Sequence, residues 1–191
     1  MMTITWSLFP KFYRGLAPAE LAGVVRDAGL DTVNLVIRDG YWVTPQNLAS
    51  ETEAFVRAMQ REGLRVHFAT AGFVPSALQE DDTPLRVLAD NGIRDFRTAY
   101  FQAGDAGPRR ALVKARRDME VLAELCARHD LRAVYQLHMK TLVTNASAVW
   151  PLVRDLPPRH IGVMIDPGNQ AHEGFEDWHR ATQLLGEYVA A

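Results

Sequence analysis

The sequence lacks the features that mark several large classes of protein. Its 191 residues include one cysteine, Cys126, so no intramolecular disulfide can form and a disulfide-stapled secreted scaffold is not expected. No apolar run reaches the roughly 18 residues that span a membrane, and no basic stretch precedes an apolar segment of signal-peptide length. We therefore expect a cytoplasmic protein that makes no membrane contact.

The sequence also lacks a large excess of positive or negative charge. A net charge of −2 creates no field that would attract nucleic acid or an anionic membrane. The densest basic cluster has helical spacing, which indicates a solvated helix face; it consists of Arg109, Arg110, Lys114, Arg116 and Arg117. Hydrophobic residues (48%) and charged residues (23%) occur in ordinary globular proportions. Residues 1–191 are expected to form a single domain.

Short β-rich segments alternate with amphipathic helical segments along the whole chain. The predicted strands are 4–9, 32–37, 64–70, 95–101, 131–138 and 160–166. The predicted helices are 18–29, 45–63, 82–91, 108–129, 146–156 and 175–188. This alternation predicts an α/β fold in which helices cover a parallel sheet with right-handed crossovers. The pattern fits an open doubly wound sheet as well as part of a closed (β/α) barrel.

The turn after the first predicted strand argues against a nucleotide-binding sheet. Residues 9–15 read Phe-Pro-Lys-Phe-Tyr-Arg-Gly, and the chain contains no GxGxxG motif and no phosphate loop with Gly-Lys-Ser/Thr. Polar residues stand instead at the carboxyl ends of strands, where parallel α/β folds place their chemistry. They are His67, Gln136, His138 and Asp166. This distribution favours the barrel.

The segment after the fifth predicted strand reads Tyr-Gln-Leu-His-Met-Lys over residues 135–140. Alternate residues of a strand share a face, so Gln136 and His138 point the same way. Polar side chains that face a barrel interior need partners. These could be a metal, a hydroxylated ligand or each other, the last being a purely structural hydrogen-bonded pair.

The sixth predicted strand is apolar and ends in Asp166-Pro-Gly-Asn169. A carboxylate in this place suits Mg²⁺ or Mn²⁺, and a nearby imidazole widens the choice toward Zn²⁺ or Co²⁺. The competing interpretation is an Asp that caps a turn or helix, because Asp-Pro-Gly is a common turn sequence. A metal centre requires the side chains of Gln136 and Asp166 to converge at one rim of the sheet.

Taken together, Tyr-Gln-x-His and Ile-Gly-x-x-x-Asp-Pro-Gly-Asn resemble the xylose isomerase-like barrel family. Residues 34–38 and 43–45, with Tyr100-Phe101, fit its sugar-phosphate isomerase/epimerase-like branch. The resemblance implies a parallel (β/α) TIM barrel, of which this chain holds about six of the eight units. It further implies that the chain stops before strand seven and is part of a longer protein, or that a partner copy covers the open barrel edges as a homo-oligomer.

The resemblance also implies a set of site residues. The family typically holds one divalent metal through a Glu, an Asp, a His and a Glu at successive strand ends. Asp166 matches the Asp ligand and Gln136 takes the place of the first Glu, while the other two ligands would lie beyond Ala191. Asn169 falls where many relatives have a His that contacts substrate, and His138 lies beside the usual Glu position, so both are expected substrate contacts.

Three further residues are candidate ligand contacts, each with a structural alternative. His67 ends the third predicted strand and could equally be a core histidine. Trp6 offers an aromatic face to a sugar, or packs. Arg38 could bind a phosphate or carboxylate in bidentate fashion, or form a salt bridge with Asp39 or another carboxylate at the rim.

The sequence therefore predicts a sugar or sugar-phosphate isomerase/epimerase-like protein that acts on a small polyol or ketose at Mn²⁺, Mg²⁺, Co²⁺ or Zn²⁺. The Gln136 amide cannot serve as a general base, so no catalytic residue is assigned. The alternative is a degenerate barrel that binds a sugar or a partner chain without catalysis. An abasic-site endonuclease of the same superfamily is disfavoured, because no multi-metal cluster and no basic stripe for DNA are visible.

Overall fold

The computed structural model describes residues 4–191, and the chain divides into two compact units. Unit 1 comprises Met1–Gly72 and Thr83–Phe96, and unit 2 comprises Phe73–Asp82 and Arg97–Ala191. Five strands follow one another in chain order in a parallel sheet, β1 (Leu35–Val36), β2 (Phe68–Thr70), β3 (Asp95–Arg97), β4 (Arg132–Gln136) and β5 (Ile161–Met164). This arrangement confirms the predicted parallel α/β fold with an open, incomplete barrel.

Unit 1 contains three helices, α1 (Pro18–Asp27), α2 (Leu48–Arg61) and α4 (Thr83–Asp90). Strands β1 and β2 pair in parallel, with Leu35 opposite Ala69. Helix α1 starts where the sequence predicts, because Pro18 suits the first turn and the Glu20 carboxylate accepts the Ala17 N–H. The apolar faces of the helices are buried, among them Leu21, Phe55 and Leu85.

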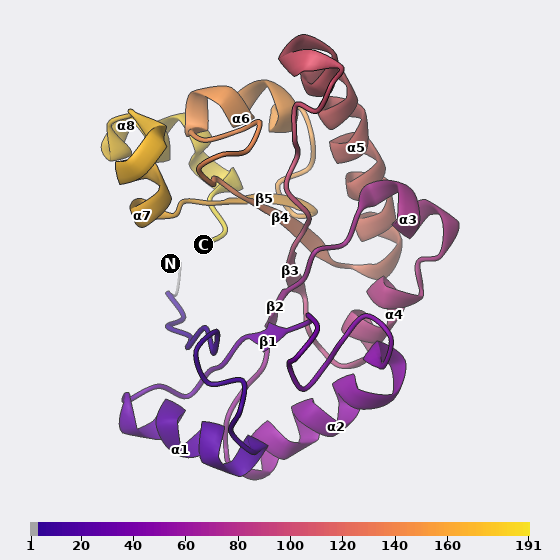
Figure 1. Ribbon diagram of the computed structural model, residues 1–191, viewed down its shortest axis with the longest axis vertical. Helices are drawn as coiled ribbons and strands as arrows, with labels where there is room; N and C mark the ends of the chain where they lie inside the picture. Colours follow the sequence, from indigo (N-terminus) through magenta and orange to yellow (C-terminus); the bar gives the residue numbers. More distant parts are fainter. Residues whose placement is uncertain (1–3) are drawn as a thin grey trace. The chain divides into compact units, whose positions relative to one another are not determined.

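Unit 2 contains the longest helix, α5 (Gly107–His129), which packs on β4 and β5 beside α6 (Figure 1). Its other helical segments are α3 (Pro75–Glu80), α6 (Ala146–Val153), α7 (Pro167–Asn169), a π-turn (Gln170–Gly174), α8 (Trp178–Leu185) and a 3-10 turn (Gly186–Tyr188). Strands β4 and β5 pair in parallel, and Gln136 stands opposite Met164. Cys126 is buried in α5, as its apolar neighbourhood predicts.

The first predicted strand, 4–9, is not a regular strand. It forms a single bridge, in which Leu8 accepts the Asn34 N–H and donates to Thr32. Trp6 is 73% exposed, so this segment lacks a buried face beyond the bridge. Pro10, which cannot donate to a ladder, then ends the pairing.

The last residues of the chain continue the sheet. Val189 bridges Val163 in parallel, and the Ala190 N–H donates to the Val163 carbonyl at 2.9 Å. Gly162 allows this approach, because a Cβ at its position would lie 2.6 Å from the Ala190 Cβ. Residues 189–191 therefore lie beside β5 in the place of a following strand.

Two helix predictions need correction. The segment before the predicted helix 82–91 contains an additional short helix, α3, which begins at Pro75. The predicted helix 175–188 is limited to α8, because Phe175 adopts a left-handed conformation (φ 50°) and Asp177 caps a new start. Within residues 4–191, no helix is long and apolar enough to cross a membrane.

Candidate functional site

The carboxyl ends of β4 and β5 bring Gln136 and Asp166 together. Gln136 is the last residue of β4, and Asp166 follows β5 by two residues. Because parallel neighbours end at the same edge of a sheet, both side chains reach one rim. The Gln136 Nε2 donates to Asp166 Oδ2 at 2.7 Å. The convergence that a metal centre requires is present, and the role of the two residues as ligands stays a prediction.

Both side chains have a second partner. The Tyr100 hydroxyl donates to Gln136 Oε1 at 2.6 Å, and Asp166 Oδ1 accepts the Asn169 N–H at 3.0 Å. The contact with Asn169 makes Asp166 the N-cap of α7. The capping role that the sequence also allowed therefore holds for Oδ1, one of the two carboxylate oxygens. Tyr100, Gln136, Asp166 and Asn169 thus form a continuous hydrogen-bonded row, here called the rim network.

Tyr100 is held from two sides. The Arg97 guanidinium lies 4.7 Å from the centroid of its ring, a cation–π distance, and the His138 ring lies 4.6 Å away. Arg97 is only 5% exposed and donates to the Thr98 carbonyl. A buried cation next to the ring fixes the phenol against Gln136. The sequence carried no clear signal for Arg97, which lies in the mixed stretch Asp95-Phe96-Arg97-Thr98, and it was not among the expected site residues.

His138 and Asn169 frame the rim network. The His138 Nδ1 lies 2.7 Å from the Met139 carbonyl, so in the tautomer that donates from Nδ1 the Nε2 is an acceptor for a ligand. Asn169 Oδ1 accepts the Met139 N–H at 3.3 Å. The Asn169 side chain therefore ties the segment after β4 to the turn after β5.

The other expected contacts belong to unit 1. Trp6 is exposed, and Arg38 is exposed and forms no ion pair within residues 4–191, so a salt bridge to Asp39 is absent there. His67 is half-buried, and this burial lowers the pKa of its imidazole. The nearby charge of Asp95 acts in the other direction and raises the pKa, but burial is the larger effect. The use of Trp6, Arg38 and His67 as ligand contacts stays a prediction.

The rim network offers two oxygen donors to a metal. Within the described part of the chain, no cluster of three or more His, Cys, Asp or Glu side chains gathers. Turning the Gln136 amide over would bring its carbonyl oxygen beside Asp166 and leave Nε2 facing the Tyr100 oxygen, which can accept. The pair therefore fits as two oxygen ligands of a hard divalent cation, which also takes water and ligand oxygens.

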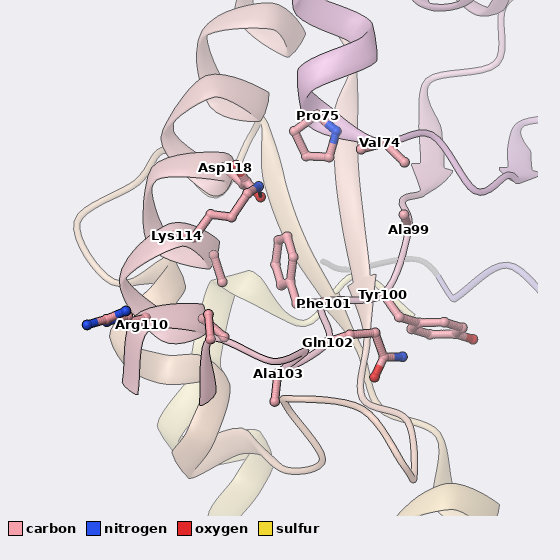
Figure 2. A pocket seen from close by; sticks show the side chains of 13 residues that line it. Val74, Pro75, Ala99, Tyr100, Phe101, Gln102, Ala103, Arg110, Lys114 and Asp118 are labelled. Atoms are coloured by element: carbon pink, nitrogen blue, oxygen red, sulfur yellow. Dashed lines mark hydrogen bonds and ion pairs between the residues drawn. The ribbon is translucent and has the colours of Figure 1, made fainter. Parts of the chain in front are cut away.

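A pocket of about 260 Å³ lies on the other side of the Tyr100 segment, beside α5 (Figure 2). Figure 2 shows Phe101 turned toward α5 and Tyr100 turned away from it. The Phe101 ring stacks on Tyr135 at 5.0 Å, and the Phe101 N–H donates to the Tyr135 hydroxyl. Burial raises the pKa of Tyr135. This apolar packing supports the backbone that presents Tyr100 to Gln136.

No family model and no curated protein matches this sequence. Solved structures do match. The probable 3-DHS dehydratase AsbF of Bacillus anthracis superposes with a TM-score of 0.75 and 17% identity over 97% of this chain and 71% of that one. D-psicose 3-epimerase, crystallised in the presence of D-fructose, has a TM-score of 0.72 and 12% identity over 98% and 71%. The structure of IOLI protein with a bound zinc atom has a TM-score of 0.72 and 10% identity, over 97% of this chain and 70% of that one.

These superpositions cover nearly the whole of this chain. Because the sequence identities are low, these similarities establish the fold alone. The chain has the fold of the xylose isomerase-like TIM barrels, as its motifs predict.

Proposed function

We propose that this chain is a cytoplasmic protein of the sugar isomerase/epimerase-like kind. It would bind a small polyol, either a sugar or a sugar phosphate, at the rim network. The observation that carries the proposal is the 2.7 Å contact between Gln136 and Asp166 at the carboxyl ends of β4 and β5. This edge is where parallel barrels bind their substrates. Support comes from the sugar named in the D-psicose 3-epimerase structure, which shares the fold.

The rim network has the chemistry to recognise adjacent hydroxyl groups. Asp166 accepts hydrogen bonds, Gln136 can both donate and accept, and His138 Nε2 can accept. In unit 1, Arg38 is proposed to bind a phosphate, and His67 and Trp6 are proposed as further ligand contacts.

A divalent metal, Mn²⁺, Mg²⁺, Co²⁺ or Zn²⁺, is part of the proposal. Asp166 would hold it directly and Gln136 would hold it through its carbonyl oxygen. When bound, such an ion polarises carbonyl or hydroxyl oxygens and eases loss of a neighbouring proton. The zinc of the IOLI structure, which has the same fold, supports this choice. A homo-oligomer that covers the open edges of the sheet belongs to the same proposal.

Calorimetric titration with Mn²⁺ tests the metal site. We expect Asp166→Ala to weaken Mn²⁺ binding at least about tenfold, since it removes the one charged ligand. Asp27→Ala is the matched control, because that carboxylate is exposed at the last residue of α1, where Ala suits the helical backbone. Binding that persists in Asp166→Ala, or that is absent from the unmodified protein, contradicts the proposal.

Gln136 specifically favours a second candidate, a barrel that binds a sugar without turning it over. An amide at this position cannot move a proton. D-Fructose, D-psicose and a panel of other ketoses and inososes, incubated with the protein and Mn²⁺, separate the two. Turnover of any of them eliminates the second candidate, and binding without turnover eliminates the first.

A further inference from the structure

Gln170 is a buried polar residue that the rim network does not use. Its side chain is 3% exposed, and within residues 4–191 neither Oε1 nor Nε2 has a hydrogen-bond partner. A buried amide without partners loses its hydration and regains nothing, so it destabilises the state in which it is found. Such a group calls for an explanation.

The turn that carries Gln170 is the turn that carries the site. Gln170 follows Asn169 directly, and its N–H donates to the Asp166 carbonyl at 2.9 Å. The stem of its side chain packs on Gly174, where a Cβ would lie 3.1 Å from the Gln170 Cβ and 3.4 Å from the Thr144 carbonyl. The stem of the Gln170 side chain therefore lies in the layer formed by residues 138–145 and 167–175, here called the rim loops.

The rim loops are joined mainly by polar contacts. The Glu173 carboxylate accepts the Lys140 N–H, and Asn145 Nδ2 donates to the Gly174 carbonyl at 2.9 Å. Lys140 and Phe175 both adopt left-handed backbone conformations, at φ 60° and 50°, which are strained for these residues. Phe175 is also 89% exposed. Moving the turn 167–175 would exchange these polar contacts for contacts with water and would release the strain at Phe175.

We propose that Gln170 is a ligand-binding residue whose amide pairs with vicinal hydroxyls of a polyol after the turn 167–175 shifts. The inference rests on the proposed function and names a residue that sets its specificity. A vicinal diol supplies one donor and one acceptor, which together satisfy Oε1 and Nε2. Binding then supplies the hydrogen bonds that the amide lacks in the free protein. The site therefore has a higher affinity for polyols than for apolar compounds of similar size.

The test compares Gln170→Leu and Gln170→Met with the unmodified chain, using D-fructose and D-psicose as probes in the presence of Mn²⁺. Calorimetric titration measures sugar affinity, and scanning calorimetry without sugar measures Tm. We expect both variants to bind the better sugar about tenfold more weakly and to melt roughly 2–6 °C higher, since a partnerless amide is removed. Gln60→Leu, at an exposed position of α2, is the matched control and should change neither quantity.

Each other result has a definite meaning. A higher Tm with unchanged sugar affinity makes Gln170 a packing residue and overturns this inference, while the proposed function stands. A lower Tm in both variants shows that the amide is already paired and also overturns it. If the unmodified chain binds neither sugar, the proposed function fails, and the inference falls with it.

Discussion

Gln136 determines how the rim network behaves without a metal. Its amide donates to Asp166 and accepts from Tyr100, so the Asp166 carboxylate is stabilised by a hydrogen bond. A Glu in the same place would put two carboxylates in contact, and their like charges would repel. The observed pair can therefore persist in the absence of a cation, which a pair of carboxylates could not do as easily.

His67 makes stability depend on pH. Burial holds the pKa of this imidazole below its ordinary value of 6.5, so near pH 6 the unfolded chain binds more protons than the folded chain. The free energy of unfolding should therefore fall as the pH drops from 6.5 toward the folded pKa. Urea unfolding of the unmodified protein and of His67→Gln, from about pH 7.5 to about pH 5, measures this loss.

The His67→Gln variant should lose less stability over this range than the unmodified protein. His179→Gln, which alters an exposed histidine of α8, should follow the unmodified curve. Parallel curves for all three proteins would show that burial of His67 carries no proton-linked cost.

The strands are shorter than their apolar segments. Residues 32–37 read as one strand, yet β1 spans only Leu35–Val36, with single bridges at Thr32 and Ile37. Bridges are spread over the segment, but a continuous ladder forms only at Leu35–Val36. Alternation of side chains predicts the extended conformation, whereas the length of a ladder depends on the neighbouring strand.

Gly162 controls the pairing of residues 189–191 with β5. Gly162→Ala would place a methyl group 2.6 Å from the Ala190 Cβ, so the last residues must move away. We expect faster amide hydrogen exchange at Ala190 and Ile165, whose N–H groups donate across this pairing. Adding Ala190→Gly removes the clash and should restore slow exchange at Ile165. Unchanged exchange in Gly162→Ala would contradict the close approach.

Ligand binding should stabilise the protein through mass action. A sugar at about 100 times its Kd contributes about 2.7 kcal/mol to a protein that binds it only when folded. For a chain of this length, that corresponds to a rise in Tm of roughly 5–10 °C. Scanning calorimetry with D-psicose and Mn²⁺ measures the rise, and Asp166→Ala should abolish it. An equal rise in the variant would locate binding away from the rim network.

Local sequence patterns were sufficient to predict the alternating elements and the parallel sheet. They also predicted that Gln136 and Asp166 meet, because strand alternation and parallel order place strand ends at one edge. Helix starts were readable where Pro or a capping side chain acts within one turn, as at Pro18. Short segments such as α3, and the loss of regular pairing in 4–9, were not readable from local patterns.

The contacts that complete the site join residues far apart in the chain. Tyr100 bonds to Gln136 across 36 positions, and Asn169 accepts the Met139 N–H across 30 positions. The missing partners of Gln170 likewise depend on which groups the rim loops bring near. Propensities and turn chemistry act between neighbours in sequence and so can be read from it. The choice among distant partners is made by packing of the folded chain, where burial decides which polar groups must pair.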